Sequence, residues 1–399
     1  MSQPALKPSY DVVIAGGGAV GSAAAYFLAA SSDFSGSILV VERDWTYSRA
    51  ATALSSASIR HQFSNPLNVR ISQFGTDFIR HFADHCAVGS EQPDLAFREN
   101  GYLFLAADNR GRQVLAANHG VQSGEGADIR LLSATEMANR FPWLRTDDLT
   151  LGSLGESGEG WFDNMGLLYG LRAKARALDA TYIENEVVGL RRSGQRVSHV
   201  SLADGSEVAC GTFINAAGTR APMLAAMAGL DLPVEPRRRS LFVVDCRNPP
   251  EGRIPMTIDP SGVFFRPEGR FFLCGCAPEF DPCVDLNDFA VAHEEFEEVI
   301  WPVLAERVPA FEALKVVNSW AGHYDFCTFD QNVIVGPHPD VDNFLFASGF
   351  SGHGLQQSPA IGRGLSELVI YGGYRSLDLG PLGCERVFAG TRFPENSVI

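Results

Sequence analysis

"YDVVIAGGGAVGSAAAYFLAA", residues 10–30, joins an apolar run, three consecutive glycines and a run of small side chains. The apolar residues 10–15 predict a short buried strand, and the small residues 19–30 after the glycines predict a helix. A second apolar run, at 37–42, predicts another strand. A strand, a tight turn, a helix and a second strand in this order begin a doubly wound parallel sheet. The sequence therefore indicates an α/β fold.

The glycines of the turn have the spacing G-x-G-x-x-G, with Gly16, Gly18 and Gly21 at the three positions. The first allows a tight turn, the second lets the backbone approach a pyrophosphate, and the third lets the helix pack on the strand. The helix N-terminus offers unpaired N–H groups and the positive end of its dipole to the phosphates. Glu42 ends the second strand and can accept hydrogen bonds from an adenosine ribose. These residues predict a bound dinucleotide, either NAD or FAD.

The net charge and the cysteine content exclude several kinds of protein. The chain has 399 residues and a net charge of −15, from 32 basic and 47 acidic side chains. An acidic protein is not expected to bind nucleic acid or an anionic membrane surface. Its eight cysteines include no C-x-x-C pair, so we expect neither a metal site nor a disulfide framework. Because no segment is suited to span a bilayer and no Arg-rich leader is visible, we expect a cytoplasmic protein.

Two later stretches extend the nucleotide signature. "NAAG", residues 215–218, ends an apolar run with small side chains that permit close approach. "SGFSGHGLQQSPAIGRGL", residues 348–365, places Gly349, Gly352 and Gly354 after another apolar run and before helix-like sequence. Glycine costs backbone entropy on folding, so its repeated use predicts that something lies very close to this backbone. The N-terminal place of the first motif and these two later stretches favour FAD over NAD. No second nucleotide motif with its own carboxylate-ended strand follows, which argues against an NAD(P)H-dependent reductase.

These features together resemble the D-amino acid oxidase-like flavoproteins, which include sarcosine oxidases, glycine oxidases and D-amino acid dehydrogenases. The resemblance covers essentially the whole chain. The segments "RVPAFEALKV", "SWAGHYDFCTFDQNVIVGPHP" and "ENSVI" are also similar to those of a mitochondrial member of the family that serves as an assembly factor for respiratory complex I. The resemblance implies a Rossmann-like FAD-binding domain with an interleaved α+β substrate domain built on an antiparallel sheet.

The two domains are expected to alternate along the chain, because the two kinds of strand pattern alternate. We expect the FAD-binding domain to comprise residues 1–95, 151–235 and 326–399. The substrate-binding domain is expected to comprise residues 96–150 and 236–325.

The resemblance implies that FAD is held by residues from several segments, and non-covalent attachment is favoured. A histidyl linkage at His323 stays open as an alternative. In such proteins the late glycine turn and the helix after it meet the flavin ring, where the helix dipole stabilises the reduced, anionic flavin. The expected cofactor contacts are Gly16, Gly18, Ala19, Val20, Gly21, Glu42, Arg43, Arg49, Ala50, Ser55, Val188, Ala216, Ala217, Gly218, Gly349, Ser351, Gly352, His353, Gly354, Leu355 and Gln356.

The family chemistry implied is oxidation of a C–N bond α to a carboxylate. Hydride passes from carbon to flavin N5, and the imine is then hydrolysed. The expected substrate is an amino acid or a secondary amine such as sarcosine, iminodiacetate or an opine. No lysine stands on the strand 271–274, where sarcosine oxidases use one to activate oxygen. The electron acceptor is therefore left open between O2 and a quinone or carrier.

A substrate carboxylate is best held by arginine, whose planar guanidinium binds both oxygens. Arg239 is implied by likeness to the D-amino acid dehydrogenases, whereas Arg237 and Arg238 are better explained by a solvated surface loop. Strand alternation makes Arg266 a second candidate, because it shares a face with Phe264. Likeness to sarcosine oxidases adds Arg60, His61 and Gln356. Tyr324 stands where many family members carry an arginine for the substrate carboxylate, and His353 lies in the late glycine turn expected beside the flavin. The full set of expected catalytic residues is Arg239, Arg266, Tyr324, His353, Arg60, His61 and Gln356.

Two functions of different class remain at this point. The first is a bacterial, cytoplasmic catabolic enzyme that oxidises an amino acid or secondary amine. The second is a flavin-containing assembly or interaction factor, like the mitochondrial relative. The sequence leaves the oligomeric state open.

Overall fold

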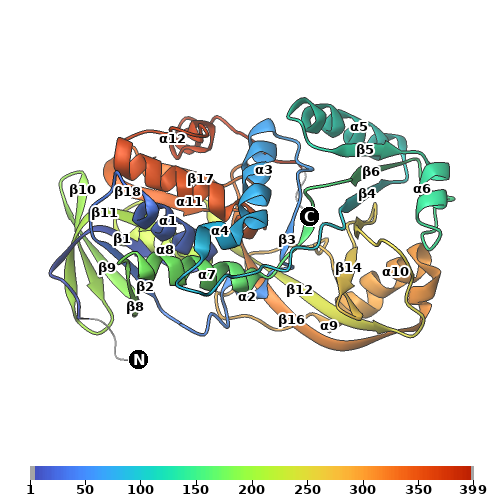
Figure 1. Ribbon diagram of the computed structural model, residues 1–399, viewed down its shortest axis with the longest axis horizontal. Helices are drawn as coiled ribbons and strands as arrows, with labels where there is room; N and C mark the ends of the chain where they lie inside the picture. Colours follow the sequence, from blue (N-terminus) through green and yellow to red (C-terminus); the bar gives the residue numbers. More distant parts are fainter. Residues whose placement is uncertain (1–4, 397–399) are drawn as a thin grey trace.

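The computed structural model describes residues 5–396. Figure 1 shows two large sheets, one in each half of the molecule. Each of them has eight strands. A small third sheet joins β3 (Ser58–Ile59) to β7 (Gly160–Trp161). The mixed α/β fold expected from the sequence is confirmed.

The first sheet is doubly wound. Its central strands run in the order β17-β18-β11-β1-β2-β8, and all neighbours from β18 to β8 are parallel. The predicted strand, turn, helix and strand at the N-terminus are confirmed as β1, α1 (Ala19–Ala30) and β2. The strands are β1 (Ser9–Ala15), β2 (Ile38–Glu42), β8 (Thr181–Glu184), β9 (Val187–Ser193), β10 (Arg196–Leu202), β11 (Glu207–Asn215), β17 (Ile334–His338) and β18 (Val341–Ser348).

Both faces of this sheet are covered. In β1, Val12 and Ile14 belong to one apolar cluster, and Val13 and Ala15 belong to another. A parallel strand buried on both sides has this continuous apolar sequence. The first cluster is built with α1, α3 (Pro66–Arg80), α4 (Phe82–Cys86), α7 (Asn164–Ala177) and α11 (Gly354–Tyr371); the second with α8 (Ala221–Met227), β9 and β10.

The small residues of α1 have a packing role of their own. A Cβ added to Gly21 would lie 1.9 Å from the carbonyl oxygen of Gly16, so the helix starts in direct contact with the turn before it. Farther along, a Cβ added to Gly362 of α11 would lie 2.6 Å from Ala23. The two helices approach this closely because neither has a large side chain there. These small residues therefore allow α11 to pack against α1 of the nucleotide-binding motif. The late glycine turn, which α11 follows, is thereby held near that motif.

The second sheet has the order β16-β12-β15-β14-β13-β4-β6-β5 and is antiparallel except between β13 and β4. Its strands are β4 (Tyr102–Ala106), β5 (Ile129–Leu132), β6 (Leu151–Gly155), β12 (Val234–Cys246), β13 (Met256–Ile258), β14 (Phe264–Glu268), β15 (Phe271–Gly275) and β16 (Leu314–Cys327). The helical segments beside it are α5 (Asn109–Gly124), α6 (Ala134–Arg140), α9 (His293–Glu295), η2 (Phe296–Ile300), α10 (Trp301–Arg307) and η3 (Pro309–Ala313).

The expected domain limits differ from the strand pairing by two residues at the start of β12 (Val234) and at the end of β16 (Cys327), and by a whole strand at β6. β6 pairs with β4 and β5 of the second sheet, so the limit between 150 and 151 is wrong by one strand. The ends of the expected outer segments, residues 1–4 and 397–399, lie outside the described residues.

Apolar residues recur at helical spacing over 65–86 and over 288–304, and neither stretch is a single regular helix in the structure. The first is divided at His81 into α3 and α4. In the second, helical structure starts only at His293, and the residues before it are irregular. Among residues 5–396, no helix has both the length and the apolar character needed to cross a membrane.

Candidate active site

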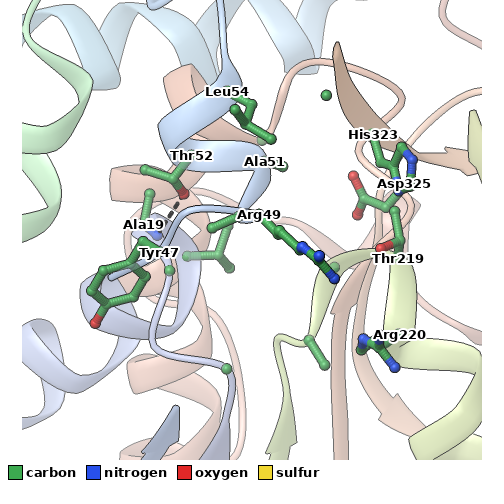
Figure 2. A pocket seen from close by; sticks show the side chains of 18 of the residues that line it. Ala19, Tyr47, Arg49, Ala51, Thr52, Leu54, Thr219, Arg220, His323 and Asp325 are labelled. Carbon is green, nitrogen blue, oxygen red and sulfur yellow. Dashed lines mark hydrogen bonds between the residues drawn. The ribbon is translucent and has the colours of Figure 1, made fainter. Parts of the chain in front are cut away.

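A cleft begins at the carboxyl ends of β1 and β2 and continues to the second sheet. It contains about 1870 Å³ of space not filled by atoms, part of it open to solvent. Clefts at the carboxyl ends of parallel strands are the usual ligand sites of doubly wound sheets. Figure 2 shows the part between α2 (Ala51–Leu54) and the turn η1 (Gly218–Arg220). Of the expected cofactor contacts, those that line the cleft are Gly16, Gly18, Ala19, Val20, Glu42, Arg43, Arg49, Ala50, Ser55, Ala216, Ala217, Gly218, Gly352, Gly354 and Leu355.

The first glycine turn has no room for a side chain at Gly16. Gly16 has a φ of +99°, and a Cβ there would lie 2.4 Å from the carbonyl oxygen of Ala216. Gly18 is the N-cap residue of α1 and forms the wall of the cleft. The N–H of Ala19 donates to Thr52 Oγ1 at 3.1 Å, as the dashed line in Figure 2 marks. The turn therefore presents bare backbone and a helix N-terminus to the cleft, as a diphosphate requires.

Glu42 closes one end of the cleft. Its carboxylate accepts from the N–H of Gly17 at 2.8 Å and from the N–H of Asp44 at 3.0 Å. Burial raises the pKa of Glu42, although these two N–H groups act in the opposite direction. Each oxygen keeps a lone pair beyond the one that these amides use. Glu42 is therefore able to accept from the hydroxyls of a ribose.

Three arginines stand around the middle of the cleft. Arg43 and Arg49 are exposed, and Arg220 is half-buried. In Figure 2 the side chains of Arg49 and Arg220 reach into the cavity from two different segments. Burial, and then the charges of Arg43 and Arg49, lower the pKa of Arg220. Such a gathering of like charge fits an anionic diphosphate. Arg220 was not among the residues expected from the sequence, although it lies two positions after the second signature.

The late glycine turn forms the inner end of the cleft. Gly352 has a φ of +93°, and a Cβ on it would lie 2.6 Å from the ring of Tyr324. Gly354 begins α11, whose first N–H groups have no partner within the helix. Gly349 and Ser351 also have positive φ values, of +81° and +51°, but they shape the turn and do not line the cleft.

Asp325 holds the turn in place and was missed from the sequence. It lies on β16, and its Oδ2 accepts from the N–H of Gly349 at 2.8 Å and of Phe350 at 3.2 Å. Burial raises the pKa of this carboxyl group to about 6, against the effect of the two N–H groups. Its only signal in the sequence is a lone acidic residue in an otherwise apolar stretch.

Replacing Asp325 with asparagine is expected to change how stability depends on pH. The pKa of Asp325 is raised in the folded protein, so its protonated form favours folding and that contribution is lost as pH rises from about 4 to about 6. Asparagine imitates the neutral form at every pH. We expect wild type to lose about 2 kcal/mol relative to Asp325→Asn over this interval, measured by denaturant unfolding. A pH-independent difference would show that the carboxyl group titrates normally.

The second sheet supplies the opposite wall. Arg239 on β12 is 8% exposed and lines the cleft with Phe264 and Tyr324. Its guanidinium lies 4.9 Å from the centre of the Tyr324 ring and binds both oxygens of Asp281 at 2.7 Å. β12 begins at Val234, so the arginine triplet lies within the strand, not in a loop before it. Arg239 and Tyr324 are the expected substrate residues that this cleft brings together.

Three of the other expected substrate residues, Arg60, His353 and Gln356, form a buried cluster outside the cleft lining. The guanidinium of Arg60 contacts His353 Nε2 at 3.0 Å and lies 4.2 Å from the centre of the Phe63 ring. Gln356 Oε1 accepts from the N–H of Arg60 at 3.0 Å. Burial, and then the charge of Arg60, hold the pKa of His353 well below its usual value. His353 and Gln356 are therefore in this buried cluster and not among the residues that line the cleft, and their contact with the cofactor stays a prediction.

His61 belongs to the same buried region. Its Nε2 lies 2.9 Å from Thr76 Oγ1, and burial lowers its pKa to about 4. Arg266 is buried as well, but it donates to the carbonyl oxygen of Ser56 from Nε at 3.1 Å and from Nη2 at 2.8 Å. It supports the segment next to the cleft and does not line the cleft itself.

Val188 and Gly21 were expected to contact the cofactor, but neither lines the cleft. Val188 has a side chain that is 49% exposed, whereas the preceding Val187 is buried and lines the cleft. Strand alternation places the two on opposite faces, so the expectation fell one residue too late. Gly21 lies behind the cleft, where it allows helix packing as expected.

The residues present fit FAD. Bare backbone and three arginines suit a diphosphate, Glu42 suits a ribose, and the late glycine turn with the start of α11 suits a flavin ring. The cleft continues to a buried arginine on the second sheet, where a substrate would meet the cofactor.

Comparison with known proteins agrees with this geometry. The family model described as "FAD dependent oxidoreductase" (DAO) matches residues 11–368. The chain is 40% identical to "FAD-dependent oxidoreductase domain-containing protein 1" of Bos taurus, covering 98% of this chain and 87% of that protein. It is 25% identical to the sarcosine oxidase subunit beta of Rhizobium meliloti, covering 93% and 86%. The crystal structure of L-proline dehydrogenase from P. horikoshii superposes with a TM-score of 0.86 at 24% identity, over 97% of this chain and all of that one. The chain therefore belongs to the DAO family of FAD-dependent oxidoreductases.

Proposed function

We propose that this protein oxidises the C–N bond of an amino acid, or of a secondary amine that carries a carboxylate. The observation that carries the proposal is Arg239, a buried arginine on the second-sheet wall of the cofactor cleft. Bound FAD supplies the two-electron acceptor for hydride. Arg239 holds the substrate carboxylate through its planar guanidinium and so fixes the position of the adjacent carbon.

The remaining wall is suited to an amine with little additional polarity. Leu241 and Phe264 line it from β12 and β14, and Tyr324 closes it against the late glycine turn. Apolar walls exclude water, which strengthens the charge interaction at Arg239. Burial raises the pKa of Tyr324, so its hydroxyl stays protonated and can donate to an oxygen of the bound carboxylate.

The names of similar proteins favour a secondary amine. Sarcosine and L-proline, in the names of two of them, are both α-amino acids with a substituted nitrogen. We therefore propose an N-substituted glycine such as sarcosine, iminodiacetate or an opine as the substrate class. The acceptor of the electrons is O2 or a quinone or carrier. β15 contains no lysine, which favours the second. A bacterial, cytoplasmic setting stays part of this proposal.

We also propose that the flavin is held non-covalently. His323 is the histidine that a covalent linkage would need, and it lines the cleft. Its Nε2 contacts the carbonyl oxygen of Asp288 at 2.6 Å, and its ring stacks on Phe289 with 4.1 Å between centres. One of its two ring nitrogens and one face of the ring are therefore already engaged within the protein.

Anaerobic mixing with a panel of secondary amines tests the function. We expect at least one of sarcosine, iminodiacetate, L-proline or an opine to bleach the flavin absorbance, whereas dimethylamine, which has no carboxylate, leaves it unchanged. Dithionite serves as the positive control for a reducible flavin. If only dithionite bleaches the flavin and the protein is recovered with a stable protein partner, the alternative of an assembly or interaction factor holds instead.

A further inference from the structure

The irregular segment 277–292, between β15 and α9, covers the cleft on the side of the second sheet. It contains no helix or strand, and Phe280 near its start is 83% exposed. Leu286 and Phe289, farther along it, line the cleft. Long segments without secondary structure are uncommon in compact domains and usually have a function, such as covering a site. We call residues 277–292 the cover segment.

Contacts at its far end tie the cover segment to both walls of the cleft. Asp288 pairs with Arg238 at 2.7 Å, and the ring of Phe289 stacks on His323. From the side of the first sheet, Arg220 donates to Asn287 at 3.4 Å and Arg49 lies 5.6 Å from the centre of the Phe289 ring. Most of these contacts are polar, long or partly exposed, so each one contributes little to stability.

The near end of the cover segment inserts a carboxylate against Arg239. Asp281 Oδ1 and Oδ2 lie 2.7 Å from Nη1 and Nη2, which is the paired geometry that a free carboxylate adopts with arginine. Arg237, on the same face of β12, donates to the carbonyl oxygen of Asp281. Asp281 itself is only partly covered, with 25% of its side chain exposed, whereas the side chain of Arg239 is 8% exposed. The chain therefore fills its own carboxylate site.

Asp281 leaves part of Arg239 unsatisfied. Nε of Arg239 is buried and has no hydrogen-bond partner within residues 5–396. An unpaired N–H of a buried charged group is costly, because it loses water without gaining an acceptor. Of the neighbouring acids, Glu295 acts on Arg239 only through its charge and also has a buried oxygen without a partner in that range. Arg239 thus retains an unused donor in the wall of the cleft.

We propose that Asp281 is an internal carboxylate ligand of Arg239, which a substrate carboxylate displaces together with the cover segment. This inference rests on the proposed function, since it assumes that Arg239 binds the substrate carboxylate. In this proposal Asp281 sets the affinity of Arg239 for the substrate carboxylate, and movement of the cover segment opens the site.

Competition from Asp281 is expected to weaken the binding of any other carboxylate to Arg239. If Arg239 is free of Asp281 for only about one-tenth of the time, the apparent dissociation constant of any carboxylate is about tenfold higher than the intrinsic one. A tether of a few residues gives such an internal ligand a high effective concentration, so even a weak pair competes.

Benzoate binding to the FAD-loaded protein, followed by the change in flavin absorbance, tests the proposal. Asp281→Asn keeps the size of the side chain and removes its charge. We expect this variant to bind benzoate about tenfold more tightly than wild type. Glu279→Gln is the matched control, because it removes one charge from the same exposed segment without touching Arg239, and we expect it to bind like wild type.

A second measurement follows the cover segment itself. Cys283 is the exposed thiol of this segment, and the other cysteines are buried or half-buried. An environment-sensitive dye on Cys283 is expected to change its emission when benzoate saturates the wild type, and to show the displaced emission in Asp281→Asn without benzoate. Cys283→Ser gives the background from labelling elsewhere.

The outcomes are distinct. Weaker benzoate binding by Asp281→Asn would mean that Asp281 positions Arg239 instead of competing for it, and unchanged binding would mean that Arg239 is not the carboxylate site; either result overturns the proposal. If Asp281→Asn binds benzoate more tightly but no amine reduces the flavin, the proposed function fails while the internal ligand remains.

Discussion

Replacing Gly16 with alanine is expected to yield a protein that retains no FAD. The added Cβ would lie 2.4 Å from the carbonyl oxygen of Ala216, and alanine is strained at a φ of +99°. Backbone cannot yield as a flexible side chain does, so β1 and β11 must separate where the diphosphate is expected to bind. We expect the affinity for FAD to fall at least about 100-fold, because overpacking and backbone strain together cost about 3 kcal/mol or more. Flavin content after purification and titration of the apoprotein with FAD measure this.

Two other glycines separate loss of the cofactor from loss of the fold. A Cβ on Gly18 would meet only Thr52 Oγ1, at 3.3 Å, so Gly18→Ala is expected to fold but to bind FAD weakly, because the methyl group occupies the wall of the cleft. A Cβ added to Gly120 in α5 would have no atom of the described residues 5–396 within 4 Å, so Gly120→Ala is expected to bind FAD like wild type. If Gly18→Ala bound FAD normally, the cofactor would not approach this turn.

The nucleotide-binding half could be predicted because its tight backbone contacts require glycine, and glycines can be recognised in the sequence. A glycine is required wherever a Cβ would strike a neighbouring backbone or a packed ring, and Gly16 and Gly352 both meet that condition with positive φ. A motif made of such glycines therefore predicts which strand and helix of the fold it joins. Arg220 could not be found in this way, since arginine is common on surfaces and only the three-dimensional path of η1 turns it into the cleft.

The substrate side was harder to predict because it depends on the direction of single side chains. Arg60 and Arg266 were expected to face the cleft, yet one donates into a buried cluster and the other to the carbonyl oxygen of Ser56. The spacing of a residue from a motif and its place in the alternation of a strand do not determine the direction of its side chain. Asp281 could not be predicted at all, because it lies in a segment with no periodic pattern and contacts Arg239 from 42 positions away.

Arg239→Met is expected to abolish most turnover of carboxylate-bearing amines while FAD stays bound. Methionine fills the space of the side chain but cannot bind a carboxylate. A bidentate, charge-assisted pair in a buried site contributes about 3–4 kcal/mol, so kcat/KM is expected to fall about 100- to 1,000-fold. Asp281 is partly exposed and can turn to solvent when its partner is lost, so the fold is expected to survive. Steady-state kinetics and flavin content of the same preparation measure both effects.

Arg238 provides the matched control for this variant, because strand alternation directs it to the opposite face of β12, where its side chain is 29% exposed and pairs with Asp288. Arg238→Met removes the same charge from the next position and is expected to change kcat/KM by no more than about threefold, as for other exposed ion pairs. Equal losses in the two variants would mean that positive charge near the cleft, not a directed contact, attracts the substrate. No loss in either would move the carboxylate site away from β12, and Arg60 would become the next arginine to test, since its charge, like that of Arg239, acts on Tyr324 at the inner end of the cleft.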